Sequence, residues 1–293
     1  MSKKKSSKKE SNKKEVKKET KGKEINVLEL DKKLANLPHT SDEYQKVLQK
    51  IQKAEKDYYG DQHILCIETD ALREKRIPTA LFGSKESYEE LCRVLKFNEF
   101  NMFNDVSSYQ PRYMVEYDYR YKQVLTFGYI TNKDRTEFIL LRKNQSNRLG
   151  MIGGHTDFHI SAYAGNPEKF LINNLYKELF EEVKIFRTVN GQEKQITNEN
   201  ELWDTVTAKM VVNDYNDHYK LRNIGFIYEI YLDVPKLDEM FRFESNEPHI
   251  HTVEKVTLKE IKEATRYHSM LKAIVAILTN SEPVVNWLNP AYY

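Results

Sequence analysis

Residues 150–158 read GMIGGHTDF, and residues 166–185 read NPEKFLINNLYKELFEEVKI. The first stretch predicts a strand that runs into two glycines, and glycines after a strand let backbone N–H groups approach an anion. The second predicts a helix, because Asn166 would cap it, Pro167 would take its first position and Glu168 would place an acid in its first turn. A strand, a double glycine, a loop and an acidic helix in this order could together hold a diphosphate and its metal ion.

Three glutamates, Glu178, Glu181 and Glu182, are mutual neighbours on this helix. A helical projection places Glu178 and Glu182 at the edge of the apolar face, beside Leu171. Like charges at this spacing repel by about a few tenths of a kcal/mol per pair, and partial burial raises that cost unless a cation compensates. Clustered carboxylates suit Mg²⁺ or Mn²⁺. The same pattern also occurs on ordinary solvated helix faces, and the helix alone leaves that alternative open.

The stretch KELFEEVKI at 177–185, preceded by Gly153 and Gly154, resembles the signature of the Nudix hydrolases. That signature reads Gly, five residues, Glu, seven residues, then Arg-Glu-apolar-x-Glu-Glu-x-Gly-apolar. It is matched position by position at Glu178, Leu179, Glu181, Glu182 and Ile185. Further sequence blocks are similar to a bacterial and phage branch of this family, which has GGH in place of GG-Lys or GG-Arg and a longer loop before its helix. These blocks lie at 63–72, 108–117, 150–155 and 211–232, so the resemblance covers about residues 62–278. It implies an α+β Nudix fold, in which a mixed β-sheet is sandwiched between α-helices.

The sequence also departs from this signature. Between Gly154 and Lys177 the loop is nine residues longer than the consensus, which puts Ile160 where the first glutamate belongs and leaves Glu168 as its stand-in. Lys177 replaces an arginine that braces the catalytic helix in the family, and a lysine lacks the planar fork of a guanidinium. Lys184 replaces the glycine near the end of the signature.

The resemblance implies that water attacks a diphosphate without a covalent intermediate. On this interpretation Glu181 and Glu182 hold Mg²⁺ or Mn²⁺, and Glu178 ligates a second ion or orients the attacking water as a base. Glu178 and Glu182 are therefore the expected catalytic residues. Gly153 and Gly154 are expected to let the backbone approach the substrate phosphates.

Other candidate ligands lie around this centre. His155, with Asp157 and His159, could form a metal cluster or could simply make hydrogen bonds within the loop. Glu247 or Glu254 could supply a further carboxylate from a late loop, as members of the family often do.

The expected function is divalent-metal-dependent hydrolysis of the diphosphate bond in a nucleoside diphosphate linked to another group, so a small nucleotide is the expected substrate. Two alternatives stay open. A catalytically silent module with the same fold would bind a nucleotide or RNA, and the departures at Lys177, Lys184 and the early glutamate favour it. An RNA 5′-end processing pyrophosphohydrolase would share the chemistry and differ in its substrate.

The rest of the chain divides into a tail, an extension and a domain. Residues 1–24 carry 11 lysines against 4 glutamates and no aromatic residue, which predicts a disordered tail. Residues 25–60 predict an N-terminal helical extension, and residues 61–293 the Nudix domain, with its core at about 110–280. Helices are expected at 42–58, from near Ser84, at 166–185 and at 258–278; strands are expected at 63–67, 113–119, 124–130, 138–142, 149–152, 207–212 and 224–232; Asn190-Gly191 marks a turn.

Composition bounds the class of protein. The 293 residues are 40% hydrophobic, which is enough for a core, and no apolar run approaches the ~18 residues of a membrane span. Cys66 and Cys92, without CxxC spacing, favour a reducing cytoplasm. The net charge of the chain is +2, but the tail alone carries +7. Such a tail would either tether the protein to nucleic acid or only make it more soluble. The helix at 42–58 is a candidate partner surface, and a homodimer is one assembly it would allow.

Overall fold

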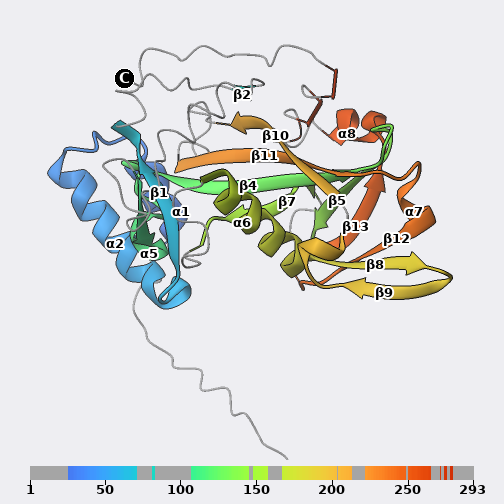
Figure 1. Ribbon diagram of the computed structural model, residues 1–293. Helices are drawn as coiled ribbons and strands as arrows, with labels where there is room; N and C mark the ends of the chain where they lie inside the picture. Colours follow the sequence, from blue (N-terminus) through green and yellow to red (C-terminus); the bar gives the residue numbers. More distant parts are fainter. Residues whose placement is uncertain are drawn as a thin grey trace, which may run out of the picture.

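The computed structural model describes residues 26–70, 81–82, 107–144, 148–157, 167–202, 204–212, 222–248 and 250–264, together with 271, 274–275 and 278–279. Within these residues a large mixed sheet and a small antiparallel sheet are flanked by helices (Figure 1). The predicted tail at 1–24 and the helix predicted from Ser84 lie outside the described residues.

The large sheet has a central parallel pair. Its order is β13 (Ile250–Val256), β5 (Phe138–Lys143), β4 (Tyr121–Thr131), β11 (Asn223–Leu232), β10 (Asp204–Val212) and β2 (Leu81–Phe82). Beside this path, β1 (His63–Glu68) pairs with β3 (Ser107–Pro111) and β4, β6 (Leu149–Gly150) pairs with β5, and β7 (Ile152–His155) pairs with β4. β4 and β11 run parallel, whereas the other described pairs are antiparallel. The strands predicted at 63–67, 124–130, 138–142, 207–212 and 224–232 are confirmed, and the strand predicted at 149–152 is interrupted at Met151.

Helices cover both faces of this sheet. The described helices are α1 (Val27–Leu34), α2 (Asp42–Tyr59), α5 (Arg112–Val115), α6 (Pro167–Glu182), α7 (Leu237–Met240) and α8 (Leu258–Ala264), of which α6 and α8 lie on opposite faces of the large sheet. Successive side chains of a strand point to opposite faces. Accordingly Ile130 of β4 packs in one cluster with Leu175 of α6, and its neighbour Tyr129 packs in another with Ile261 of α8. This arrangement confirms the predicted α+β class with a mixed sheet between helices. None of the helices in the described residues has the length and apolar composition to cross a membrane.

The N-terminal helices are fixed to the segment that leads into β4. α2 confirms the helix predicted at 42–58, and Ser41 caps it by accepting a hydrogen bond from the Tyr44 N–H at 3.1 Å. The Tyr44 hydroxyl donates to Asp118 Oδ1 at 3.0 Å and accepts from the Tyr119 N–H at 2.8 Å. Because Tyr44, Asp118 and Tyr119 are all buried, these bonds hold α2 in one position against the domain.

The strand predicted at 113–119 is wrong. These residues form α5 and the turn before β4 instead. Pro111 ends β3 and precedes the helix, a position where its missing N–H costs nothing. Arg112 Nε then donates to Glu116 Oε2 at 2.9 Å across one helical turn. The alternating apolar pattern of the segment reflects the burial of Val115 and Tyr119 from a helix and a turn rather than from a strand.

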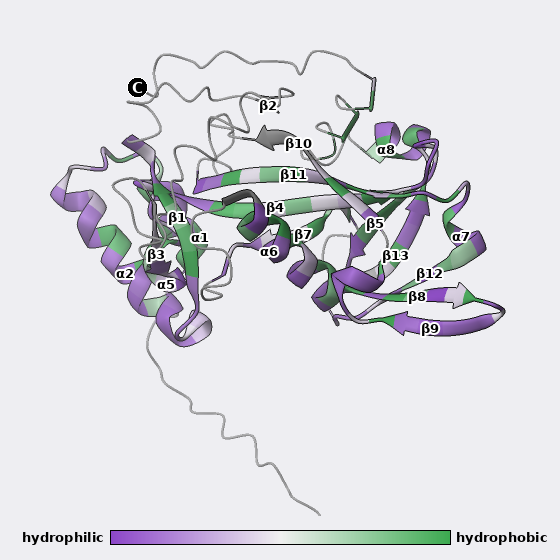
Figure 2. Ribbon diagram, in the orientation of Figure 1, coloured by the Kyte–Doolittle hydropathy of each residue, from purple (hydrophilic) through white to green (hydrophobic). Residues whose placement is uncertain are grey.

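The helix predicted at 166–185 ends earlier, at Glu182, because β8 (Val183–Val189) begins immediately after it. Every second side chain at the start of β8 is buried, beginning with Val183 and Ile185, and this alternation is the period of a strand. Asn190 and Gly191 have φ angles of 52° and 76° and turn β8 into β9 (Gln192–Ile196), which confirms the predicted turn. β12 (Phe241–Ser245) pairs on the other side of β8. β9 is hydrophilic along most of its length (Figure 2), in keeping with its place at the edge of the small sheet.

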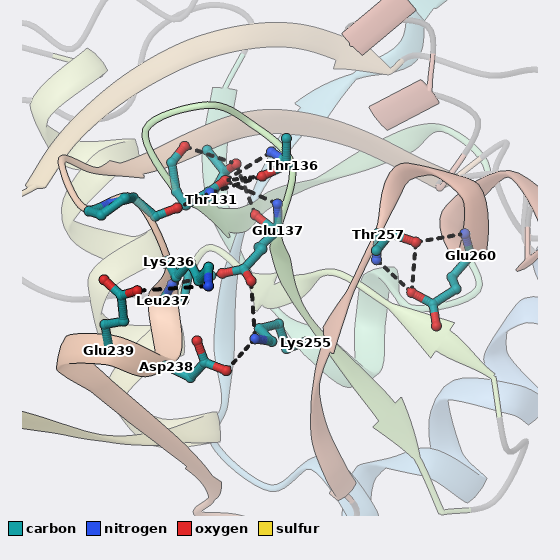
Figure 3. A network of polar contacts seen from close by, with 12 residues as sticks. Thr131, Thr136, Glu137, Lys236, Leu237, Asp238, Glu239, Lys255, Thr257 and Glu260 are labelled. Atoms are coloured by element: carbon teal, nitrogen blue, oxygen red, sulfur yellow. Dashed lines mark hydrogen bonds and ion pairs between the residues drawn. The ribbon is translucent and has the colours of Figure 1, made fainter.

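Side chains also fix the turn between β4 and β5. Asn132 Oδ1 accepts the backbone N–H groups of Thr136 at 2.9 Å and Glu137 at 3.0 Å. Glu137 in turn accepts from the Leu237 N–H at 2.7 Å and from the Lys255 ammonium at 3.1 Å (Figure 3). The turn, α7 and β13 are thereby joined at one place. Of the helix predicted at 258–278, α8 is described to Ala264, and part of the remainder lies outside the described residues.

Candidate active site

Two glycines of β7 face the neighbouring strand and α6 at very short range. Gly153 has a φ of +130°, and a Cβ there would lie 2.0 Å from the backbone oxygen of Thr126 on β4. A Cβ on Gly154 would lie 2.4 Å from Oε2 of Glu178. The backbone N–H of Gly153 donates to Oε2 of Glu182 at 2.8 Å. Close approach to the β4 backbone therefore requires a glycine at 153, whereas a Cβ at 154 would displace the Glu178 carboxylate; two carboxylates of α6 lie against these glycines.

These two carboxylates are poorly solvated. The Glu182 residue is 4% exposed and the Glu178 side chain 13% exposed. Burial raises the pKa of Glu178 to about 7, although Lys177 opposes the rise. Burial likewise raises the pKa of Glu182 to about 7, against the opposing effects of the Gly153 N–H and the charge of Lys143. The α6 backbone thus holds two acids where a negative charge is costly.

The ammonium of Lys177 lies among three carboxylates. Its Nζ is 2.9 Å from Oδ2 of Asp157, 3.2 Å from Oε1 of Glu178 and 3.1 Å from Oε2 of Glu181. Burial acts to lower the pKa of Lys177, but its bonds to Asp157 and Glu181 and the charge of Glu178 outweigh burial and raise it. The ammonium lowers the pKa of Glu178, but burial outweighs it and keeps that pKa raised.

Asp157 reaches this cluster from the segment after β7, which the N-terminal part of the chain holds in place. Ile64 of β1 forms an isolated antiparallel bridge with Asp157, and the Leu65 N–H donates to the Thr156 oxygen at 2.8 Å. The Gln62 Nε2 donates to Asp157 Oδ1 at 3.1 Å. The other Asp157 oxygen therefore remains for Lys177.

The predicted later carboxylates lie in different places. Glu247 follows β12 beside the end of α6, where the Asn246 N–H donates to the Glu182 backbone oxygen at 2.9 Å, and its charge contributes to the raised pKa of Glu182. Glu254 lies on β13 and accepts from Arg142 of β5 at 2.5 and 2.6 Å. The structure thus brings Glu247 near the α6 glutamates and pairs Glu254 with a cation of the neighbouring strand.

His155 follows the two glycines but bonds to β4 rather than to the glutamates. Its Nε2 is 2.6 Å from Oε1 of Gln123, whose Nε2 donates to the backbone oxygen of Val115 at 3.2 Å. Burial lowers the pKa of His155 to about 3, with further lowering by the charges of Arg112 and Arg222, so the ring is neutral near pH 7. His155 therefore links β7 to β4 through Gln123, and Gln123 in turn bonds to the end of α5.

The start of α6 is described only in part. Glu168 lies in its first turn, and its side chain is outside the described residues. His159 is outside them too.

Asn174 is a neighbour of the site that the sequence pattern did not single out. It is 5% exposed and lies one helical turn before Glu178. Its Nδ2 donates at 2.7 Å to Oγ1 of Thr126, the β4 residue paired with Gly154, and at 3.2 Å to the backbone oxygen of His155, which follows Gly154. Its Oδ1 is buried with no hydrogen-bond partner among the described residues. The signal that could have found it is its spacing of four residues from Glu178, which places both on one helix face.

The donor chemistry of the site fits a hard divalent cation. Among the residues that the structure describes, no three His, Cys, Asp or Glu side chains form a ready-made metal cage. Mg²⁺ does not require one, because proteins usually hold it through one or two carboxylates, water and substrate phosphates. Glu178 and Glu182 supply two buried carboxylates with raised pKa values, and the position of Lys177 shows that the cluster attracts positive charge.

Comparison with known proteins identifies the fold. No family model matches the sequence, and no curated protein matches it. The structure does align with a solved one, that of Tm1382, a candidate Nudix hydrolase, with a TM-score of 0.50 and 17% identity over 74% of this chain and 98% of that one. The chain has the Nudix fold. Weaker similarity is found to MutT from Aliivibrio salmonicida and Vibrio cholerae (TM-score 0.31, 14% identity, 53% of this chain and 98% of that one) and to an Ap4A hydrolase of C. elegans (TM-score 0.31, 13% identity, 54% of this chain and 98% of that one).

Proposed function

We propose that this protein is a divalent-metal-dependent hydrolase that cleaves the diphosphate bond of a nucleoside diphosphate linked to another group. One observation carries the proposal: Glu178 and Glu182 both lie against the double glycine of β7, Glu182 through a 2.8 Å bond from the Gly153 N–H and Glu178 against Gly154. The Nudix fold supports it, because the signature glutamates and glycines of the sequence meet at one place in that fold.

The protein's own groups account for the steps of hydrolysis. A water oxygen attacks one phosphorus, the bridging P–O bond breaks, and the water's proton passes to a carboxylate. Glu178 suits that role, because burial raises its pKa to about 7, so a substantial fraction is in the basic form near neutral pH and can accept the proton. Gly153 and Gly154 lie beside the α6 carboxylates, and we propose that the backbone approaches the substrate phosphates there.

The metal ligands are proposed from the same helix. Glu178, Glu181 and Glu182 would hold Mg²⁺ or Mn²⁺, and a bound ion would neutralise the diphosphate and lower the pKa of the attacking water. Glu247 is the candidate for a further carboxylate, because its charge already acts on Glu182.

The test is a panel of substrates. Nucleotide and phosphate release would be followed for nucleoside triphosphates, dinucleoside polyphosphates, ADP-ribose, NAD-type dinucleotides and 5′-capped RNA, each with Mg²⁺, with Mn²⁺ and with a chelator. We expect metal-dependent cleavage of at least one small diphosphate. Turnover of the capped RNA alone would make the protein an RNA 5′-end processing enzyme. Nucleotide binding without any turnover would show a catalytically silent module.

A further inference from the structure

Among the residues that the structure describes, Asp157 is the one carboxylate bound to Lys177 that does not come from α6. The Lys177 ammonium is 2.9 Å from Asp157, 3.2 Å from Glu178 and 3.1 Å from Glu181. The Lys177 and Asp157 side chains are 22% and 23% exposed, so their contact is shielded from solvent over most of its surface. Lys177 therefore has a partner that is separate from the glutamates to which it is also bound.

Asp157 is held more firmly than a loop residue usually is. Its backbone is bridged to Ile64 of β1, and the preceding residue, Thr156, exchanges bonds with two strands: its N–H donates to the Val124 oxygen at 2.9 Å, and its oxygen accepts from Leu65 at 2.8 Å. The amide of Gln62 fixes one carboxylate oxygen at 3.1 Å. Asp157 can thus keep Lys177 at a fixed point while the α6 glutamates exchange their partner.

A divalent cation and the Lys177 ammonium compete for the same oxygens. Oε1 of Glu178 and Oε2 of Glu181 are bound to the ammonium, and two cations next to each other repel. Binding of the ion through these oxygens therefore requires Lys177 to give them up. Asp157 lowers the cost of that step, since the ammonium keeps one buried ion pair when it leaves the glutamates.

We infer that Lys177 serves as a built-in counter-ion that substitutes for the divalent cation at Glu178 and Glu181, and that Asp157 is the positioning residue that holds it aside when the cation binds. The inference rests on the proposed function, because the competing ion is the one proposed there. It also gives the N-terminal part of the chain a role at the site, since β1 and Gln62 fix Asp157.

A double-mutant cycle on Mn²⁺ binding tests this, with Mn²⁺ alone as the probe and no substrate present. Titration calorimetry, or the electron paramagnetic resonance signal of free Mn²⁺, would give the Mn²⁺ affinity of four full-length proteins. These are the wild type, Asp157→Asn, Lys177→Met and the double variant. We expect Lys177→Met to bind Mn²⁺ more tightly than the wild type. Asp157→Asn should lose about tenfold in the wild-type background and less than about threefold in the Lys177→Met background, because Asp157 acts through Lys177.

Each outcome separates the two proposals. Asp238→Asn, which removes an ion-paired aspartate from α7, is the matched control and should leave the affinity unchanged. Equal losses for Asp157→Asn in both backgrounds would show that Asp157 contributes only its charge, and looser binding by Lys177→Met would show that Lys177 is no competitor; either result overturns the inference and leaves the proposed function standing. No Mn²⁺ binding by any of the four folded proteins would overturn the inference, whereas the proposed function is decided separately by metal-dependent turnover in the substrate panel. Thermal unfolding of each variant confirms that it is folded.

Discussion

Glu182→Gln should make the metal-free protein more stable above neutral pH. The pKa of Glu182 is raised by burial from 4.5 to about 7, so the carboxylate is costly in the folded state. When the pKa of an acid is higher in the folded than in the unfolded protein, the free energy of unfolding is largest below the unfolded-state pKa. It falls as the pH rises from the unfolded-state pKa to the folded-state pKa. The span from 4.5 to about 7 corresponds to a loss of about 3 kcal/mol. Glutamine avoids this cost and can still accept the Gly153 N–H, but its buried amide donors cost about 1 kcal/mol.

The net gain from Glu182→Gln is therefore about 2 kcal/mol near pH 8, or roughly 4–8 °C in Tm, and it turns into a loss of about 1 kcal/mol below about pH 4.5, where only the cost of the amide remains. Urea unfolding of both proteins in a chelator across this pH range measures it. Glu239→Gln is the matched control, because Glu239 is 53% exposed and its loss should change stability by less than about 0.5 kcal/mol. A Glu182→Gln protein that is less stable than the wild type at the alkaline end would refute the argument from burial.

The remaining predictions concern the glycines and the tail. Gly154→Ala should displace the Glu178 carboxylate, which would lie 2.4 Å from the new Cβ, and abolish turnover with little loss of Tm, because a flexible side chain can move. Gly153→Ala should instead lower stability by about 2 kcal/mol or more, since its Cβ would meet the Thr126 backbone at 2.0 Å and its φ is +130°; calorimetric unfolding of the two variants would contradict this if both were equally stable. Deletion of residues 1–24 should leave turnover of a small nucleotide unchanged and abolish a salt-dependent affinity for RNA with a log–log slope of about −4; equal RNA affinities with and without the tail would show a solubiliser only.

Strong local signals predicted much of the fold. The apolar repeat at 42–58 predicted α2, and Asn190-Gly191 predicted a hairpin turn, because both signals depend on residues that are close together in sequence. The end of α6 and the segment after Pro111 were mistaken because tertiary burial decides them: Val183 and Ile185 pack as a strand, and Val115 and Tyr119 reach the core from a helix and a turn. Local apolar patterns do not distinguish these cases.

At the candidate site, too, the sequence predicted the local features and missed those that depend on contacts between distant segments. The sequence singled out Glu178, Glu181 and Glu182 and the double glycine, because repulsion among neighbouring acids is visible in one helix. It did not reveal that Lys177 would compensate them, since its partner Asp157 is placed by β1, far away in the sequence. Pairwise contacts between distant segments require the fold itself.

The most direct test of the central claim compares turnover among glutamate variants. On a substrate found in the panel, kcat with Mg²⁺ would be measured in ¹⁸O-labelled water for the wild type, Glu178→Gln, Glu182→Gln and the control Glu239→Gln. We expect the label in a phosphate of the product, a loss of about 10²-fold or more for the two α6 variants, and no loss for the control. Wild-type turnover by either folded α6 variant would contradict the assignment of catalysis to the glutamates that lie against Gly153 and Gly154.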